Sequence, residues 1–93
     1  MPISNEIKKF AEAMQCKIDK NAHKDNWPMW SKEGNRSWKT CDIEFLLEKL
    51  KEEHSELVIA IANGEPLVNI KWEAADVANI AMMIADCLGA LDV

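Results

Sequence analysis

The sequence has few basic residues relative to acidic ones, no close pair of cysteines and no long hydrophobic run. Its 93 residues include 11 Lys and Arg against 16 Asp and Glu, which gives a formal net charge of -5 at pH 7. A protein that binds nucleic acid through a basic surface has more basic than acidic residues, so we exclude a nucleic-acid partner. A partner that carries phosphate would need a bridging cation.

The cysteines and the apolar segments also exclude several classes of protein. Cys16, Cys41 and Cys87 are odd in number and form no C-x-x-C pair, so they indicate neither a disulfide framework nor a structural zinc site. The N-terminal MPISNEIKKF lacks the apolar core of a signal peptide, and the apolar run at 74–85 is short and interrupted by Asp76 and Asn79. We therefore expect a cytoplasmic protein without a membrane partner.

Apolar residues recur at helical spacing in three stretches of the chain. Ser4, followed three residues later by Ile7, opens the first helix, which we place at about residues 4–22. The periodicity fails over 23–41, where Pro28, Gly34 and three tryptophans indicate an ordered loop rather than a linker.

The remaining two helices form a hairpin. Thr40 or Asp42 can cap a second helix, which ends at the Asn63-Gly64 pair, and the third runs from about 66 to 89. We find no repeats and no convincing strand, so the chain is predicted to be one all-α domain over residues 1–93. A domain of this size buries only about 60–65% of its unfolded surface, and we expect oligomerisation to complete the helix bundle.

The third helix carries polar groups where its neighbours predict burial. From 74 to 85 every residue is apolar except Asp76 and Asn79, and Glu73 lies one step ahead. A buried carboxylate costs several kcal/mol unless it is paired or binds a metal. A satisfied buried polar pair is the structural alternative for Asp76 and Asn79.

The hairpin predicts which acids of the two helices face each other. Residues at equal height in an antiparallel hairpin have position numbers of constant sum, which sets Glu53 opposite Asp76 and Glu56 opposite Glu73. The spacing of three puts both acids of a helix on one face. Four clustered carboxylates repel unless a cation joins them, and oxygen ligands favour Mg²⁺ or Mn²⁺ over zinc. The run EEHSE at 52–56 alone is more typical of a solvated helix face.

These residues resemble a known signature. The pattern E-x-x-E, sixteen residues and E-x-x-D, from Glu53 to Asp76, is similar to the metal-binding signature of the all-α nucleotide pyrophosphohydrolases of MazG type. LKEEHSEL at 50–57 and EAADVANIAMMIAD at 73–86 resemble the two motifs of that family. The likeness covers about residues 43–88, and HKDNW at 23–27 is similar to a less specific upstream element.

The resemblance implies a Mg²⁺-dependent hydrolysis of (d)NTP to (d)NMP and pyrophosphate. It assigns metal binding to the four acids Glu53, Glu56, Glu73 and Asp76 and implies that one Glu is the general base, a role for which we choose Glu53. The expected substrate contacts are Asn79, His23, Lys24 and Trp27. Trp30 or Trp38 could stack on the base instead, and the tryptophans could equally be core anchors.

The implied assembly is a homodimer or homotetramer, joined through the Ala- and Met-rich third helix. The competing hypothesis is a non-catalytic helical module that oligomerises or binds a partner, with acids that are solvated or pair with basic groups of that partner.

Overall fold

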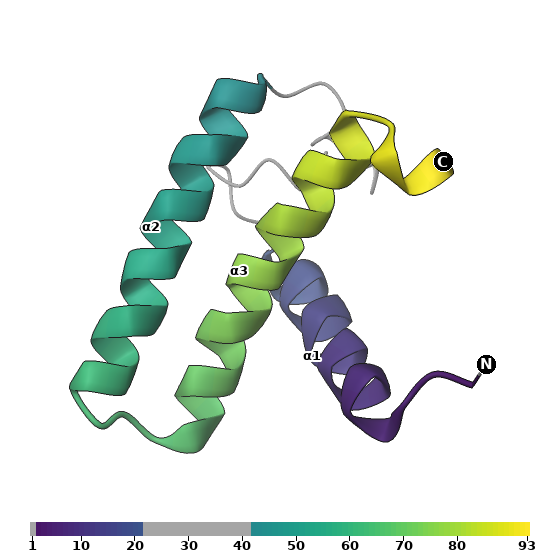
Figure 1. The fold of residues 1–93 in the computed structure, drawn as a ribbon. Helices are drawn as coiled ribbons and strands as arrows, with labels where there is room; N and C mark the ends of the chain where they lie inside the picture. The colour runs from purple at the N-terminus through teal and green to yellow at the C-terminus, as the bar shows by residue number, and fades with distance from the viewer. Residues whose placement is uncertain (1, 22–41) are drawn as a thin grey trace.

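The computed structural model describes residues 2–21 and 42–93, which form three helices and a short 3-10 turn. The helices are α1 (Asn5–Asn21), α2 (Ile43–Ala62) and α3 (Leu67–Cys87), and the turn η2 spans Ala90–Asp92. Figure 1 shows α2 and α3 as an antiparallel hairpin. No strand occurs in the described ranges, and the predicted all-α class and the helical hairpin are confirmed.

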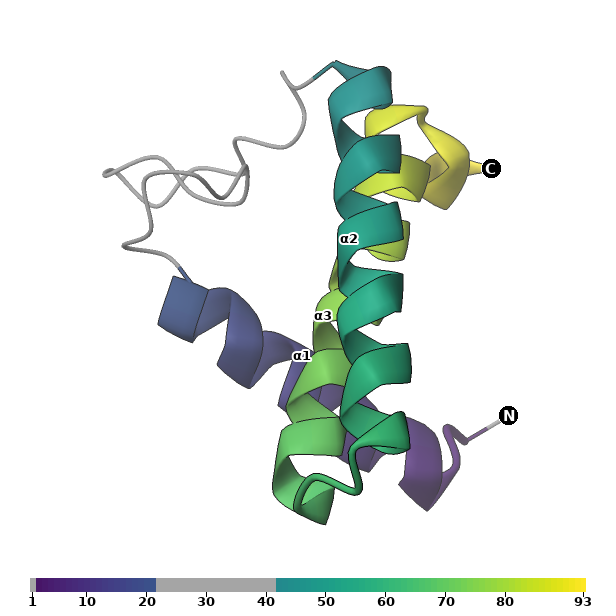
Figure 2. The ribbon, with the colours of Figure 1, turned by 90° about the vertical axis from the view of Figure 1, so that its left-hand side faces the viewer.

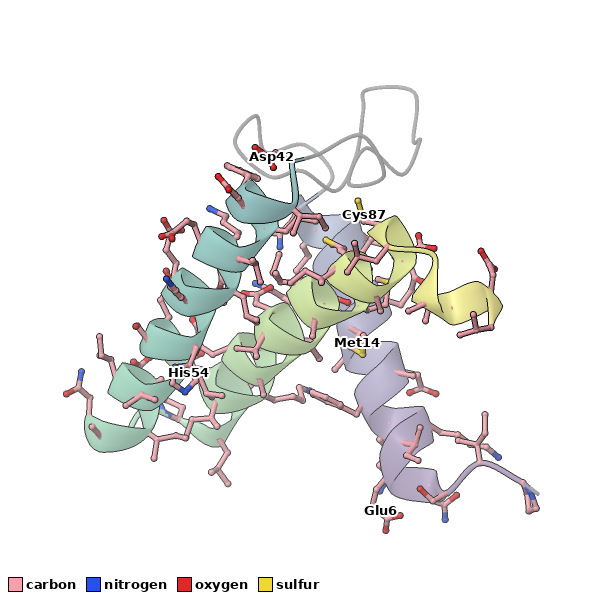
Figure 3. All side chains as sticks on the ribbon, turned by 45° about the horizontal axis from the view of Figure 1, so that its top comes forward. Glu6, Met14, Asp42, His54 and Cys87 are labelled. Atoms are coloured by element: carbon pink, nitrogen blue, oxygen red, sulfur yellow. The ribbon has the colours of Figure 1, made fainter. Side chains whose placement is uncertain are left out.

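Local sequence signals set the ends of the helices. Of the two candidate caps, Asp42 begins α2 by accepting a hydrogen bond from the Glu44 amide at 3.1 Å, while Thr40 lies outside the described residues (Figure 3). At the start of α1, the Ser4 hydroxyl accepts from the Ile7 amide at 3.3 Å. These side chains bind amides that have no partner within their own helix.

The turn between α2 and α3 is a Schellman motif with Gly64 in the left-handed conformation. Gly64 has a φ of 64°, its amide donates to the Ile61 carbonyl, and the Glu65 amide donates to the Ala60 carbonyl at 3.0 Å. Glycine adopts this backbone conformation without the steric cost that a Cβ imposes. The turn fixes how α3 is aligned along α2.

Helix α3 is the central element of the fold. It packs against both α1 and α2, whereas the backbones of α1 and α2 do not come close to each other within the described residues. In Figure 2, α1 crosses behind the hairpin at a steep angle. A helix covered from two sides needs apolar residues around most of its circumference, which explains the apolar composition of α3.

The core joins residues from all three helices. Leu46, Ile80 and Met83 are fully buried, and Ile18 of α1 is 6% exposed. Met83 and Ala75 of α3 are enclosed within the chain, whereas Ala81 of the same helix is exposed, so the expected interface through the third helix stays a prediction. Within the described ranges, no helix is long and apolar enough to cross a membrane.

Two adjacent leucines of α2 provide a test of this core. Leu46 is fully buried and Leu47 is 43% exposed. We expect Leu46→Ala to lower the free energy of unfolding by about 2–5 kcal/mol, and Leu47→Ala by less than about 1 kcal/mol, because only the first leaves a cavity. Urea titration followed by circular dichroism measures both values. Equal losses for the two variants would contradict the packing.

Candidate functional site

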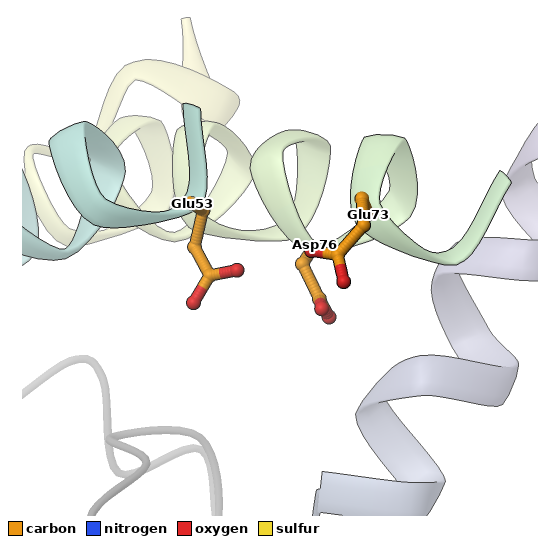
Figure 4. A group of neighbouring side chains, drawn as sticks. All are labelled: Glu53, Glu73 and Asp76. Carbon is orange, nitrogen blue, oxygen red and sulfur yellow. The ribbon is translucent and has the colours of Figure 1, made fainter. Parts of the chain in front are cut away.

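The hairpin gathers three of the predicted acids. Carboxylate oxygens of Glu53 on α2 and of Glu73 and Asp76 on α3 all lie within 4.8 Å of one another. In Figure 4, the three side chains point to the same side of the two helices. Glu53 is 3% exposed and Asp76 is 5% exposed, so two of the charges are almost fully withdrawn from water.

Glu56, the fourth predicted acid, lies beside this group and is exposed. A hydrogen-bonding contact with Glu56 and its negative charge raise the pKa of both Glu53 and Glu73. The structure therefore brings Glu53, Glu73 and Asp76 together as one cluster and places Glu56 next to it. Glu56 thus lies close to both Glu53 and Glu73, and the expected pairing of Glu53 with Asp76 and of Glu56 with Glu73 stays a prediction.

The cluster is electrostatically strained without a cation. The pKa of Glu53 rises from 4.5 to about 8, first because burial penalises the charged form, then through the contact with Glu56 and the charges of Asp76 and Glu73. The pKa of Glu73 is also raised, first by burial and then by the negative charges of Glu56 and Asp76. The positive charge of Lys17 opposes this rise. Neighbouring carboxylates in low dielectric retain protons at pH values where isolated ones lose them.

Helix α1 contributes two side chains that sequence reasoning missed. The Lys17 ammonium lies 3.4 Å from Asp76 Oδ2, and Asn21 Nδ2 donates to Asp76 Oδ1 at 3.5 Å. The feature of the sequence that could have identified them is their helical spacing from Met14 and Ile18, which puts them beside the apolar side of the first helix. That pattern shows that they face the protein interior, but it does not identify which acid they meet.

Asn79 is fully buried and joins α3 to α1. Its Nδ2 donates to the carbonyl of Met14 on α1 at 3.0 Å. Met14 is labelled in Figure 3. The amide thus has a structural role, and its assignment to substrate binding stays a prediction. His23, Lys24 and Trp27 lie outside the described residues, so their assignments also stay predictions.

Four buried side-chain oxygens find no hydrogen-bond donor among the described residues. They belong to two carboxyl groups and two side-chain amides: Glu53 Oε2, Glu73 Oε2, Asn21 Oδ1 and Asn79 Oδ1. Buried polar atoms are nearly always satisfied by hydrogen bonds, ordered water or ions. Carboxylate and amide oxygens are the ligands that Mg²⁺ and Mn²⁺ prefer, so the side chains present here fit a hard divalent cation.

Comparison with protein families identifies the family of the chain. The family model described as phosphoribosyl-ATP pyrophosphohydrolase matches residues 7–89, a range that includes all four acids and the α1 residues that contact Asp76. This all-α family of nucleotide pyrophosphohydrolases is related to the MazG-like proteins. Neither a curated protein nor a solved structure matches the chain significantly.

The pKa of Glu53 predicts how the stability of the metal-free protein depends on pH. Because this pKa is about 8 in the folded protein, against 4.5 for an ordinary glutamate, the folded state binds more protons than the unfolded state between these two pH values. The free energy of unfolding must then fall as pH rises. We expect it to be lower at about pH 8.5 than at about pH 5, by on the order of 2 kcal/mol, in urea titrations with EDTA.

Two variants test the origin of this dependence. Glu53→Gln should remove most of it, because the amide does not titrate. Glu52→Gln, the neighbouring control whose side chain is 61% exposed and pairs with Lys49, should leave it intact. If Glu53→Gln retained the pH dependence of the parent, another group would be its source.

Proposed function

Since the chain belongs to the phosphoribosyl-ATP pyrophosphohydrolase family, we propose that it is a Mg²⁺-dependent hydrolase that converts (d)NTP to (d)NMP and pyrophosphate. The observation that carries this proposal is the group of three carboxylates on α2 and α3, with buried oxygens that lack donors. Such a site is poorly suited to a purely structural role, because it costs stability and gains no partner for those oxygens.

Glu53, Glu56, Glu73 and Asp76 would hold the cation, and Mn²⁺ could replace Mg²⁺ on the same oxygens. When bound, the ion neutralises phosphate charge and lowers the pKa of coordinated water. Glu53 is the proposed general base, since it is the acid of α2 that lies buried within the cluster. It takes a proton from the attacking water as the anhydride bond between the first and second phosphates breaks, and pyrophosphate leaves.

The substrate is proposed to be a nucleotide with a 5′-triphosphate chain. The family is named after phosphoribosyl-ATP, which carries the same reacting chain as a nucleoside triphosphate. His23, Lys24 and Trp27 are proposed to contact the phosphates or the base. The Asn79 oxygen without a donor suits a sugar hydroxyl better than a phosphate, because a phosphate oxygen offers no proton. We also propose a cytoplasmic location, which agrees with such substrates.

We propose a homodimer or homotetramer as the assembled form. Large apolar side chains around the α2–α3 turn are half or more exposed, namely Val58, Ile59, Ile61, Leu67 and Val68. Exposed apolar residues gathered near one turn of the chain typically pack against another chain. The same exposed residues also favour the competing hypothesis of a non-catalytic oligomerisation module. The following assays distinguish that module from an enzyme.

The activity is tested by measuring pyrophosphate release from the four standard ribonucleoside triphosphates, the four deoxynucleoside triphosphates and phosphoribosyl-ATP. We expect release from at least one of them with Mg²⁺ and none with EDTA, because the carboxylates alone cannot neutralise a polyphosphate. The same panel reports base and sugar preference. Absence of release from every compound, by folded protein with Mg²⁺, would contradict the proposed reaction.

Asp76→Asn separates the enzyme from the structural module. We expect turnover to fall by roughly 100-fold or more, since an amide replaces a charged metal ligand in a pocket of similar shape. Asp19→Asn, an exposed position on α1, should retain the activity of the parent. Unchanged turnover in Asp76→Asn, combined with a large loss of stability, would favour the structural module.

The oligomeric state is tested by size-exclusion chromatography with light scattering. We expect the parent to have two or four times the mass of the 10.5 kDa chain. Replacing both Ile59 and Ile61 by Ser should shift the mass towards the monomer, because these side chains are 55% and 57% exposed on the isolated chain. A monomeric parent would contradict the proposal.

A further inference from the structure

Lys17 reaches the acidic cluster from outside the helical hairpin. Its ammonium lies 3.4 Å from Asp76 Oδ2, and its side chain is 17% exposed although lysine side chains are normally solvated. The positive charge lowers the pKa of Glu73, so Lys17 influences the cluster beyond its ion-pair partner. The proposed function gives no role to this residue.

The ammonium and a metal ion would compete for the same oxygen. A Mg²⁺–oxygen bond is about 2.1 Å long, so an ion held by Asp76 Oδ2 would be only a few ångströms from the ammonium of Lys17. Like charges at that separation repel strongly in a site that is partly withdrawn from water. The flexible four-carbon stem of lysine allows the ammonium to leave while its α1 backbone stays in place.

The charge of the substrate provides a new partner for that ammonium. A triphosphate chain carries more negative charge than one divalent ion neutralises, and the protein itself has a net charge of -5. A further cation next to the cluster would therefore help to neutralise the bound phosphate groups. Lysine binds phosphate oxygens as a point charge, and α1 already positions Lys17 beside the acids.

We propose that Lys17 is a substrate-binding residue that neutralises Asp76 in the metal-free protein and moves to a phosphate oxygen of the pyrophosphate group when the metal binds. This inference rests on the proposed function, because it requires both the metal and the phosphate chain at this site. It adds Lys17, a residue of α1, to the substrate-binding residues that were assigned from the sequence.

Lys20 offers a matched control on the same helix. It carries the same charge one turn further along α1, but its ammonium lies 4.5 Å from the centre of the Trp72 ring, as a cation–π contact. Removing it changes the net charge of the protein as much as removing Lys17 does. The two variants therefore separate a specific contact from a general electrostatic effect.

The experiment is a pair of calorimetric titrations at about pH 8.5, first with Mg²⁺ alone and then with inorganic pyrophosphate in saturating Mg²⁺. We expect Lys17→Gln to bind Mg²⁺ roughly three- to tenfold more tightly, because the competing cation is gone, and pyrophosphate about tenfold more weakly. Lys20→Gln should change either affinity by less than about twofold.

A second variant keeps the test decisive if Lys17→Gln folds poorly. Lys17→Arg retains the charge and can hold a carboxylate through two parallel hydrogen bonds, so it should bind Mg²⁺ more weakly than the parent. If both Lys17 variants bound Mg²⁺ and pyrophosphate as tightly as the parent, the role of Lys17 would be overturned and the proposed function would stand. Equal losses of pyrophosphate binding in Lys17→Gln and Lys20→Gln would have the same meaning. A parent protein that binds no Mg²⁺ would overturn the proposed function as well.

Discussion

Mutual repulsion of Glu53, Glu73 and Asp76 is the constraint to which the rest of the structure responds. Their oxygens lie within 4.8 Å of one another, and Glu53 and Asp76 are almost fully buried. Glu73 and Asp76 share one face of α3, and the packing of α2 against α3 brings Glu53 to them. The apolar core of Leu46, Ile80 and Met83 offsets the cost of the cluster.

The metal-free protein relieves part of this repulsion in two ways. Burial and the neighbouring carboxylates raise the pKa of Glu53 to about 8, which favours its neutral form near pH 7, and Lys17 places a positive charge next to Asp76. Both arrangements are reversible, since a proton can leave and a lysine side chain can turn. A ligand that binds only the folded state stabilises it, so a cation in this site would couple binding to folding.

The short turn at Gly64 is as important to the site as the acids themselves. Successive residues of an α-helix are rotated by about 100°, so one residue more or less in the turn would move Glu73 and Asp76 away from Glu53. The Schellman hydrogen bonds from the Gly64 and Glu65 amides prevent such a shift. A small local motif thereby sets the distances between groups on different helices.

The sequence alone determined the three helices, the turn at Asn63-Gly64 and the meeting of Glu53 with Glu73 and Asp76. These features depend on local periodicity, capping and a short connection, all of which can be counted along the chain. Only the tertiary structure decided that Glu56 stays exposed beside the cluster, that Lys17 and Asn21 bind Asp76, and that Asn79 bonds to the Met14 carbonyl. The contacts of Lys17, Asn21 and Asn79 all depend on how α1 crosses α3. That crossing is set by packing between residues more than fifty positions apart, which no local pattern encodes.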